Sequence, residues 1–577
     1  EKSARLRQVE HWQTLYSNCM ATRHDEARSD ISDHTAPEKI ESPIRSDFGA
    51  TIIESARPRQ FLFFVSCFFM SVASILGTGI LGLPVRLTHS GFYPFLVIFI
   101  VCLLMQILSV VYFIEILQRA QECQRIAAEH RLESMNIPML PAGSQFAQDH
   151  YNTPHKQGPD LLYLGQLYLK APYRWIYDVS VMLHFVAILI SYALAGSEAY
   201  AHVMNANQRA LIAPFVVTFT LVILFARRIL TPMISILTLA KGSLLVLMVS
   251  VATAVGSRVS QPVVTDWRRI GEPFLISTVA LGGVTNVMPV MFGKVKQIGA
   301  LLMLCLSLHM FSTERFQSVQ LSRHKSDMKR FRNAVILALV ACWVLNIMWC
   351  NAVLRIVPQF SSGPDSVSLQ RAEEMGESST GVLSRVIDLS YPQFGWVAVL
   401  VIVFILISIT VSYVTVGNAC KHTLDGFASD VHQKAIATPF QERGFAFPPR
   451  KLQLLVGMVL EKDLLFRGVL YIITFGFILA VSAINPHAFL LVLEHGASLA
   501  LNLETGVFVV MMLRASRKMP SRYSSASLAP GSTLSVMEQN IPLPVNKYLY
   551  ALQHVVLLYF SFAVVYDIIL ISLSLFK

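Results

Sequence analysis

The stretch Gly77-Thr78-Gly79-Ile80-Leu81-Gly82-Leu83-Pro84 lies inside a long apolar segment, 61–86. Three glycines and one proline in eight residues disfavour a continuous helix, because glycine is conformationally free and proline lacks the amide hydrogen. The segment is nevertheless long enough to cross a membrane, which takes about 20 apolar residues. Backbone groups freed at membrane depth must line a cavity or be buried in protein. We therefore predict a broken membrane helix beside a binding site.

A second interrupted stretch, Gly282-Gly283-Val284-Thr285-Asn286-Val287-Met288-Pro289, lies in the sixth apolar segment of the chain. The first and sixth segments hold equivalent places in two halves of five spans, and because five is odd the halves have opposite topology. Paired broken helices in an inverted repeat are typical of secondary transporters with a site at the bilayer midplane. The alternative is that the glycines only allow close helix packing. The matched positions favour the transporter.

The composition of the whole chain agrees with a membrane protein. Of 577 residues, 54% are hydrophobic and only 14% are charged, whereas about a quarter of the residues of a soluble protein are charged. We predict an all-α integral membrane protein with eleven transmembrane helices: a 5+5 inverted-repeat core, as in the leucine-transporter fold, plus one additional span. The predicted spans are 61–86, 92–117, 176–203, 210–225, 232–256, 272–292, 331–357, 395–420, 464–484, 487–513 and 548–576.

The net charge of +11 marks the topology of the chain and not a nucleic-acid partner. With a cytosolic N-terminus, 37 of the 47 lysines and arginines fall on the cytosolic side, as the positive-inside rule requires. The C-terminus is then outside. The expected location is either the plasma membrane or an endolysosomal membrane.

Five regions follow from these spans. An apolar insertion at 297–312 is too short for a span, and a genuine span or a gene-model artefact are its alternatives. The predicted regions are a disordered cytosolic head (1–60), the first five-span repeat (61–256), the second repeat with the insertion (257–514), a cytosolic loop (515–547) and the eleventh span (548–577).

The broken spans resemble a known family. Gly77–Pro84 with the flanking Ser90-Gly91, and Val287-Met288-Pro289-Val290, are similar to motifs of the amino acid/auxin permease family, of the amino acid–polyamine–organocation superfamily. The resemblance implies symport of a neutral amino acid into the cytosol. Sodium-coupled members have an asparagine where this chain has Ala73, and a histidine where it has Val284. These departures favour a proton as the coupling ion.

Lys241 is a basic residue in the middle of the fifth span, about 15 Å from its cytosolic end at the helical rise per residue. A charged lysine at that depth costs about 2.5–3.5 kcal/mol on insertion scales, which indicates a paired or functional residue. Burial favours the neutral amine, so proton exchange is feasible. The resemblance adds a role, because some proton-coupled bacterial members of the superfamily have a span-5 lysine where their relatives bind sodium. It implies that the Lys241 ammonium replaces a bound cation, contacting the span-1 break and the span-8 hydroxyls of Ser408 and Thr410, of which Thr410 resembles the hydroxyl ligand of the sodium-coupled relatives. Ser412 continues the same alternating series. The alternative is a structural lysine bonded to carbonyls.

The substrate is predicted to meet backbone N–H and C=O groups at the two breaks, because a half-helix N-terminus attracts a carboxylate. Tyr192, in span 3, would close over it. The predicted substrate-binding residues are Ser74, Gly77, Thr78, Gly79, Tyr192, Gly282, Gly283, Thr285 and Asn286.

Other polar residues of the spans carry weaker predictions. His184 is expected to be a packing residue more than a proton relay, Glu198 to lie at the outer rim, and Glu115 to join an inner-gate ion pair. Span 10 carries a polar stripe that serves either packing or an ion pathway, and Glu494 and Glu504 point away from each other. The stripe comprises His495, Ser498 and Asn502, and Asp567 is expected to be peripheral.

The sequence gives no metal, cofactor or enzyme motif. The glycines of the first span match GxGxxG formally, but no strand precedes them. We therefore expect a secondary active transporter of small neutral amino acids that works by proton-coupled symport and alternating access. Its expected partners are the substrate and the lipid bilayer, with no nucleic acid and no obligate protein partner. The alternatives are a non-transporting amino-acid sensor or scaffold, and a sodium-coupled symporter.

Overall fold

The structure is a computed structural model in which the chain divides into two units, Glu1–Phe61 and Leu62–Lys577. The residues that it describes are 64–77, 79–134, 159–225, 227–293, 313–361, 363, 366–441, 451–485, 491–518 and 541–575. The predicted head and the insertion at 297–312 lie outside these residues. The described residues form helices and connecting segments, without a strand.

The number and places of the predicted spans are confirmed. Ten described helices are long and apolar enough to cross a membrane, and one bent pair of helices adds an eleventh span. The protein is therefore an all-α multi-pass membrane protein. Its uninterrupted span helices are α4 (Phe92–Ser134), α7 (Ala171–Met204), α8 (Gln208–Phe225), α9 (Arg227–Val259), α12 (Thr313–Ile356), α15 (Gly395–Gln441) and α16 (Lys451–Ile484).

The first span is broken at the start of its glycine stretch. A helix over Phe64–Ile75 is followed by α3 (Gly79–Arg86), and the two are bent by 44°. Pro84 does not cause the break, because it lies inside α3. A proline leaves the carbonyl four residues earlier without its helical donor. Trp349 supplies that donor, since its Nε1 lies 3.0 Å from the Ile80 carbonyl oxygen.

The sixth span is interrupted at Gly282 and Gly283. Helix α10 (Glu272–Leu281) ends there, and the chain is helical again over 284–293. Gly283 has a φ of +80°, a conformation that glycine adopts without the steric cost that a side chain brings. Pro289 lies in the second half of the span, beyond the break.

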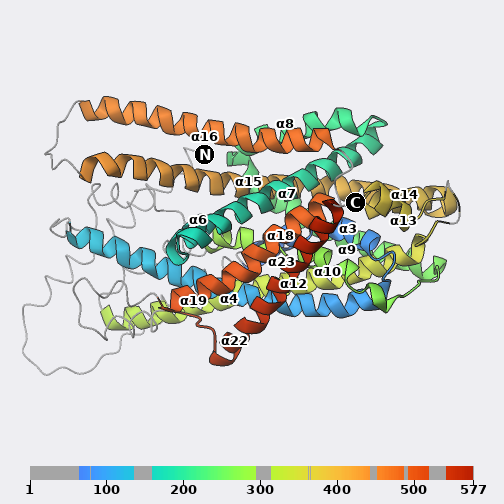
Figure 1. The fold of residues 1–577 in the computed structure, drawn as a ribbon, viewed down its shortest axis with the longest axis horizontal. Helices are drawn as coiled ribbons and strands as arrows, with labels where there is room; N and C mark the ends of the chain where they lie inside the picture. The colour runs from blue at the N-terminus through green and yellow to red at the C-terminus, as the bar shows by residue number, and fades with distance from the viewer. Residues whose placement is uncertain are drawn as a thin grey trace, which may run out of the picture. The chain divides into compact units, whose positions relative to one another are not determined.

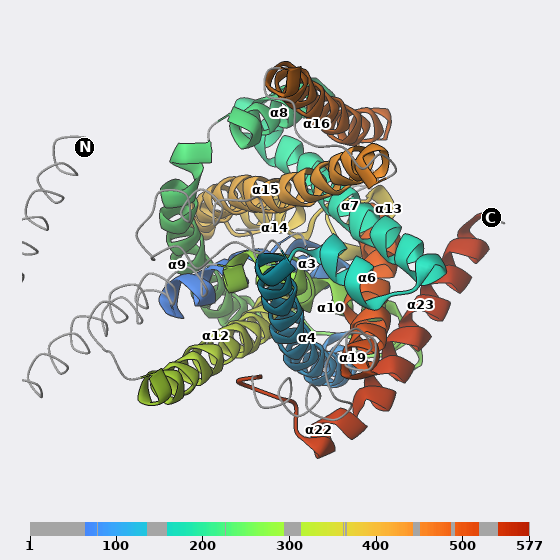
Figure 2. The ribbon, with the colours of Figure 1, turned by 90° about the vertical axis from the view of Figure 1, so that its left-hand side faces the viewer.

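The two broken spans lie in the middle of the helices of the second unit. Figure 2 shows α3 and α10 surrounded by α4, α7, α9, α12 and α15. In its apolar part, the sixth span is 94% buried, whereas α16 is 11% buried. In Figure 1, α16 and α8 run side by side along one edge. Peripheral helices face lipid, so the enclosed broken spans are where irregular backbone is tolerated.

The tenth span is not a regular α-helix. It contains two π-helical turns, η4 (Val492–Ala497) and η5 (Asn502–Phe508), separated by α18 (Ser498–Leu501) and followed by α19 (Val509–Lys518). Such turns are rare and occur often at functional sites. The eleventh span follows as α22 (Lys547–Ala551) and α23 (Gln553–Leu575).

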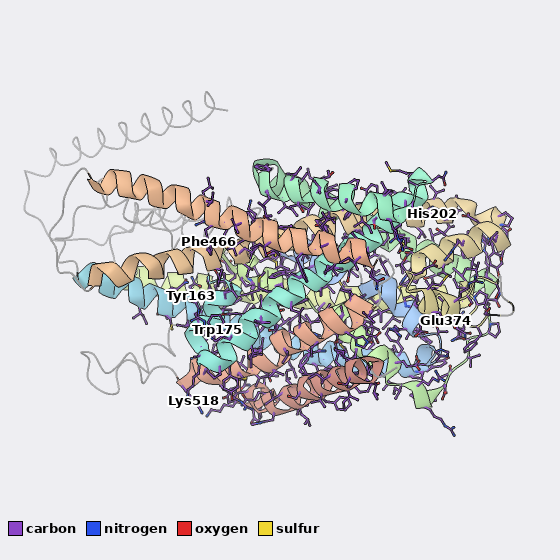
Figure 3. All side chains as sticks on the ribbon, turned by 45° about the horizontal axis from the view of Figure 1, so that its top comes forward. Tyr163, Trp175, His202, Glu374, Phe466 and Lys518 are labelled. Atoms are coloured by element: carbon purple, nitrogen blue, oxygen red, sulfur yellow. The ribbon has the colours of Figure 1, made fainter. Side chains whose placement is uncertain are left out.

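Short helices cover the two ends of the spans. One of them is α6 (Leu161–Tyr168), capped by Asp160. At the other end lie η2 (Trp267–Arg269), α13 (Leu369–Met375), α14 (Ser379–Ser390) and η3 (Pro392–Phe394). Figure 3 shows His202 and Glu374 toward one end of the helices and Tyr163 and Lys518 toward the other. The predicted loops of opposite sides are thus separated in space.

Candidate functional site

The two helix breaks lie against each other. The Ser74 hydroxyl donates a hydrogen bond to the Gly283 carbonyl oxygen at 2.9 Å. Just beyond the first break, a Cβ placed on Gly79 would lie 2.6 Å from the Cα of Ala280, so the backbones of α3 and α10 are packed too closely for a side chain. These contacts bring together four of the predicted site residues: Ser74, Gly79, Gly282 and Gly283. Thr78 lies outside the described residues.

Lys241 reaches the break of span 1. Its Nζ donates to the carbonyl oxygens of Ala73, at 3.3 Å, and Leu76, at 2.5 Å, and to the Ser412 hydroxyl at 2.5 Å. The ammonium group has three protons, so three acceptors satisfy it. The residue is 1% exposed, and among the described residues no carboxylate forms an ion pair with it. A buried amine is thus held by neutral oxygens.

The span-8 hydroxyl that contacts Lys241 is Ser412, whereas the expected contacts were with Ser408 and Thr410. Residues two apart in a helix point in different directions, whereas residues four apart share a face. Ser408 is therefore one turn from Ser412 on the same face, and it is buried. Thr410 points elsewhere, and its hydroxyl lies 3.2 Å from that of Tyr200. The prediction of a direct contact with Thr410 was wrong, because residues at alternate positions of a helix do not share a face.

Tyr192 lies beside the same break. A Cβ on Gly77 would come within 2.1 Å of the Tyr192 hydroxyl oxygen, so the tyrosine fills the space that the glycine leaves. Tyr192 is buried, and its hydroxyl is also in hydrogen-bonding range of Ser412. Lys241, Ser412, Tyr192 and Gly77 thus form one group at the first break.

A second polar group lies beyond the break of span 6. The Asn286 amide nitrogen lies 3.1 Å from His184 Nδ1, and the same ring atom lies 2.7 Å from Glu504 Oε2. These three side chains come from the sixth, third and tenth spans. The neighbouring Thr285 is buried, and its hydroxyl has no partner among the described residues. Sequence reasoning placed His184 and Glu504 outside the site, because the rotation of their helices was unknown.

The polar stripe of span 10 forms a connected group that faces span 11. The Asn502 amide donates to the Ser498 hydroxyl at 3.0 Å, and His495 Nδ1 lies 2.9 Å from Asp567 Oδ1. Asp567 was expected to be peripheral, but its side chain is fully buried against this stripe. A carboxylate in the last span therefore belongs to the buried polar network of the protein.

Ion pairs bridge the helices at both ends of the spans. At the end near α13, Arg86 pairs with Glu373, at 2.7 Å, and with Glu494. At the opposite end, Glu115 accepts hydrogen bonds from Arg119 at 2.8 Å and from Arg517 at 2.8 and 2.9 Å. The Glu115 side chain is fully buried, so its charge depends on these arginines for compensation.

The segment that precedes span 11 is tied to the same cluster. The Val545 amide donates to Glu115 Oε2 at 2.7 Å, and the Leu543 amide donates to Gln118 Oε1 at 3.0 Å. The expected inner ion pair of Glu115 thus joins spans 2, 10 and 11. Glu198 lies where α14 begins, with its Oε1 3.5 Å from the Ser378 hydroxyl.

The described residues hold no group of three or more histidine, cysteine or acidic side chains that could bind a metal ion. The arrangement instead offers backbone groups at two facing helix breaks, a buried amine on one side and a buried carboxylate–histidine pair on the other. Groups of this kind are chemically suited to hold a small zwitterion and to exchange protons.

Comparisons with known proteins give one family match, which covers a small part of the chain. Residues 63–148 match the tryptophan/tyrosine permease family. This match includes the first break and the second span, and it supports a membrane transporter in general, without the narrower amino acid/auxin permease family that the motifs resembled. No curated protein matches the chain.

Solved structures of a manganese transporter from Eremococcus coleocola resemble the chain loosely. One, in complex with an aromatic bis-isothiourea substituted compound, gives a TM-score of 0.42 at 13% identity, covering 94% of this chain and 98% of that chain. A mutant of the same transporter gives 0.41 at 12% identity, with the same coverage.

Proposed function

We propose that the protein is a secondary transporter that carries neutral amino acids into the cytosol by proton-coupled symport. The observation that carries this proposal is the contact of Lys241 with the Ala73 and Leu76 carbonyl oxygens at the first helix break. A titratable amine there is bonded to the same short segment that would bind the substrate. Protonation of Lys241 and binding of the substrate would therefore both affect the backbone of the first helix break.

The substrate carboxylate would bind at the N-terminal end of α3. The first amide groups of a helix have no partner within the helix, and the helix dipole makes this end attractive to anions. Helix α3 begins at Gly79, directly after the break. The substrate amine would be bound by carbonyl oxygens at the ends of the preceding half-helices, around Leu76 and Gly282.

The substrate class rests on the nature of the site and on the family match. A zwitterion pairs with opposite helix ends without a dedicated charged side chain, which suits an amino acid with a neutral side chain. The matched family is one of tryptophan and tyrosine permeases, so aromatic amino acids belong in the test beside small ones.

Lys241 would couple the proton to the conformational change. As an ammonium group it donates three hydrogen bonds and holds the first span to Ser412 of span 8. As a neutral amine it has only two hydrogens, so at least one of the three bonds is lost. Alternating access by rocking of one helix group against another would follow loosening of this contact.

The test is uptake into proteoliposomes that contain the purified full chain. A panel of neutral amino acids, including tryptophan and tyrosine, is supplied with and without an inwardly directed proton gradient, and with and without sodium. We expect uptake of at least one of them to depend on the proton gradient and to be indifferent to sodium. Flux of no amino acid, with measurable binding, would contradict transport and favour a sensor.

Lys241→Gln is the variant for the coupling role, and Lys421→Gln is its matched control. Lys421 also donates to helix carbonyls, those of Ile223 and Leu224 at 3.3 and 3.1 Å, but away from the break. We expect the Lys241 variant to lose the pH dependence of uptake and the Lys421 variant to keep it. Full pH-dependent uptake by Lys241→Gln would refute the role of this amine.

A further inference from the structure

Glu504 is a buried carboxylate with an incomplete set of partners. Its side chain is 2% exposed and that of His184 is 1% exposed. Among the described residues, His184 is its ion-pair partner, and neither a lysine nor an arginine pairs with it. A carboxylate removed from water is costly unless a positive charge compensates it.

The hydrogens of this pair can be counted. If His184 Nδ1 carries a hydrogen, it donates to Glu504 Oε2, and Nε2 is then a bare acceptor. The Asn286 amide would present its oxygen to Nδ1, since the two amide ends are interchangeable by a flip. In this state the pair has a net charge of −1. One additional proton, on Nε2 or on the carboxylate, makes it neutral.

Unused polar atoms mark where that proton goes. Glu504 Oε1 and His184 Nε2 are both buried without a hydrogen-bond partner in the described part of the chain. Buried polar groups are normally paired. Here two neighbouring side chains each have one satisfied atom and one open acceptor, and such a pair of acceptors suits a bound proton.

The described groups that surround Glu504 supply no positive charge, so the negative charge of the carboxylate can be neutralised only by a proton on the pair itself. From α7, Tyr177 lies in its range, and the carboxylates of Asp178 and Asp160 act on the same tyrosine. From α4, the Ser109 hydroxyl bonds the Thr505 carbonyl oxygen at 2.7 Å, and from α23 the ring of Phe560 packs on Gly506. None of these neighbours carries a positive charge.

The pair is linked to the break of span 6 by Asn286. The backbone N–H of Asn286 donates to the Gly283 carbonyl oxygen at 3.3 Å, and the same oxygen accepts from the Ser74 hydroxyl of span 1 at 2.9 Å. A change in the hydrogen bond between Asn286 and His184 therefore acts on the backbone where the two broken helices meet. Lys241 contacts the same part of span 1, because it donates to the carbonyl oxygen of Ala73, the residue before Ser74.

We propose that His184 and Glu504 form a proton-binding pair, distinct from Lys241, that takes up one proton beside the span-6 break. The proposal rests on the proposed function in assigning this proton a role in transport. The binding step itself is simple: one proton from the solution adds to the pair, and its charge changes from −1 to zero. The site holds a proton and not a sodium ion, since an imidazole nitrogen is a poor ligand for sodium compared with oxygen.

Infrared titration of the purified full chain tests proton binding without any transport. Upon acidification, wild-type protein should show a titrating band of a carboxylic acid or an imidazolium ring, and the band should be lost in both Glu504→Gln and His184→Gln. Glu272→Gln is the control, because Glu272 lies near the start of span 6 with a side chain 34% exposed and an ion pair to Arg269. Glu504→Asp retains the carboxyl group and should keep a shifted titration.

Two results would overturn the proposal. One is a pH-difference spectrum that Glu504→Gln and His184→Gln leave unchanged. The other is a carboxylate band that responds to sodium at fixed pH and not to protons, which would make the pair a sodium site. Elution of each variant as a single species verifies that it is folded.

Transport assays then assign the role of the pair. We expect Glu504→Gln to retain exchange of substrate across the membrane and to lose accumulation driven by a proton gradient. If Glu504→Gln accumulates substrate like wild type, the pair has no part in coupling. If the wild type moves no amino acid, the proposed function fails, while the infrared titration still decides whether the pair binds a proton.

Discussion

Gly79→Ala tests the close packing of the two broken helices. The new Cβ would lie 2.6 Å from Ala280 Cα and 3.0 Å from its Cβ, and the nearest atom belongs to the backbone and cannot rotate away. Helix α3 would have to move from α10, at a cost of about 1–3 kcal/mol for an overpacked core. Because the same movement separates the breaks, we expect lower thermal stability in detergent and loss of substrate binding.

Gly476→Ala is the control for this prediction. Gly476 lies in the peripheral helix α16, and a Cβ there would have nothing within 4 Å. Alanine is the better helix former by about 1 kcal/mol, so stability should be unchanged or slightly higher. The reasoning would be refuted if both variants unfold at the wild-type temperature and Gly79→Ala binds substrate normally.

Three further predictions concern single contacts. Trp349→Phe leaves the Ile80 carbonyl buried without its donor, so thermal unfolding should show a loss of about 1–3 kcal/mol, and unchanged unfolding would contradict this account of the proline in α3. Glu115→Gln leaves two arginines without their shared carboxylate, and we expect faster cleavage by protease in the loop 515–547 between spans 10 and 11. Cleavage at the wild-type rate would contradict the view that Glu115 holds spans 2, 10 and 11 together. Ser412→Ala should change the pH dependence of uptake and Thr410→Val should not, and the reverse order would mean that the hydroxyl contact was assigned wrongly.

The positions of the spans could be predicted because the bilayer sets the length of apolar segment that each span needs. The breaks could be predicted because Gly77 and the pair Gly282-Gly283 interrupt such segments. The sequence could not predict that Pro84 lies inside a helix. Nothing near it in sequence shows that Trp349 donates to the Ile80 carbonyl that the proline leaves free. The depth of Lys241 in span 5 indicated a paired or functional residue, and its contact with the first break was expected from the family resemblance.

Side-chain partners were harder to predict, because they depend on the rotation of each helix. Thr410 looked equivalent to Ser412 in an alternating series, but only one of them faces the lysine. Asp567 was expected towards the outer side of span 11 and therefore peripheral, whereas its side chain is buried against the irregular tenth span. Glu504 could have been found only by asking which buried carboxylate has no basic partner.

Substrate-driven proton movement is the most direct test of the central claim. Proteoliposomes that contain the full chain and a pH-sensitive dye in the lumen are mixed with a transported amino acid, with no gradient imposed. The account predicts that the amino acid acidifies the lumen of wild-type vesicles, that Lys241→Gln abolishes this signal, and that Lys421→Gln retains it. Uptake of the amino acid by wild-type protein without any change in luminal pH would contradict proton-coupled transport.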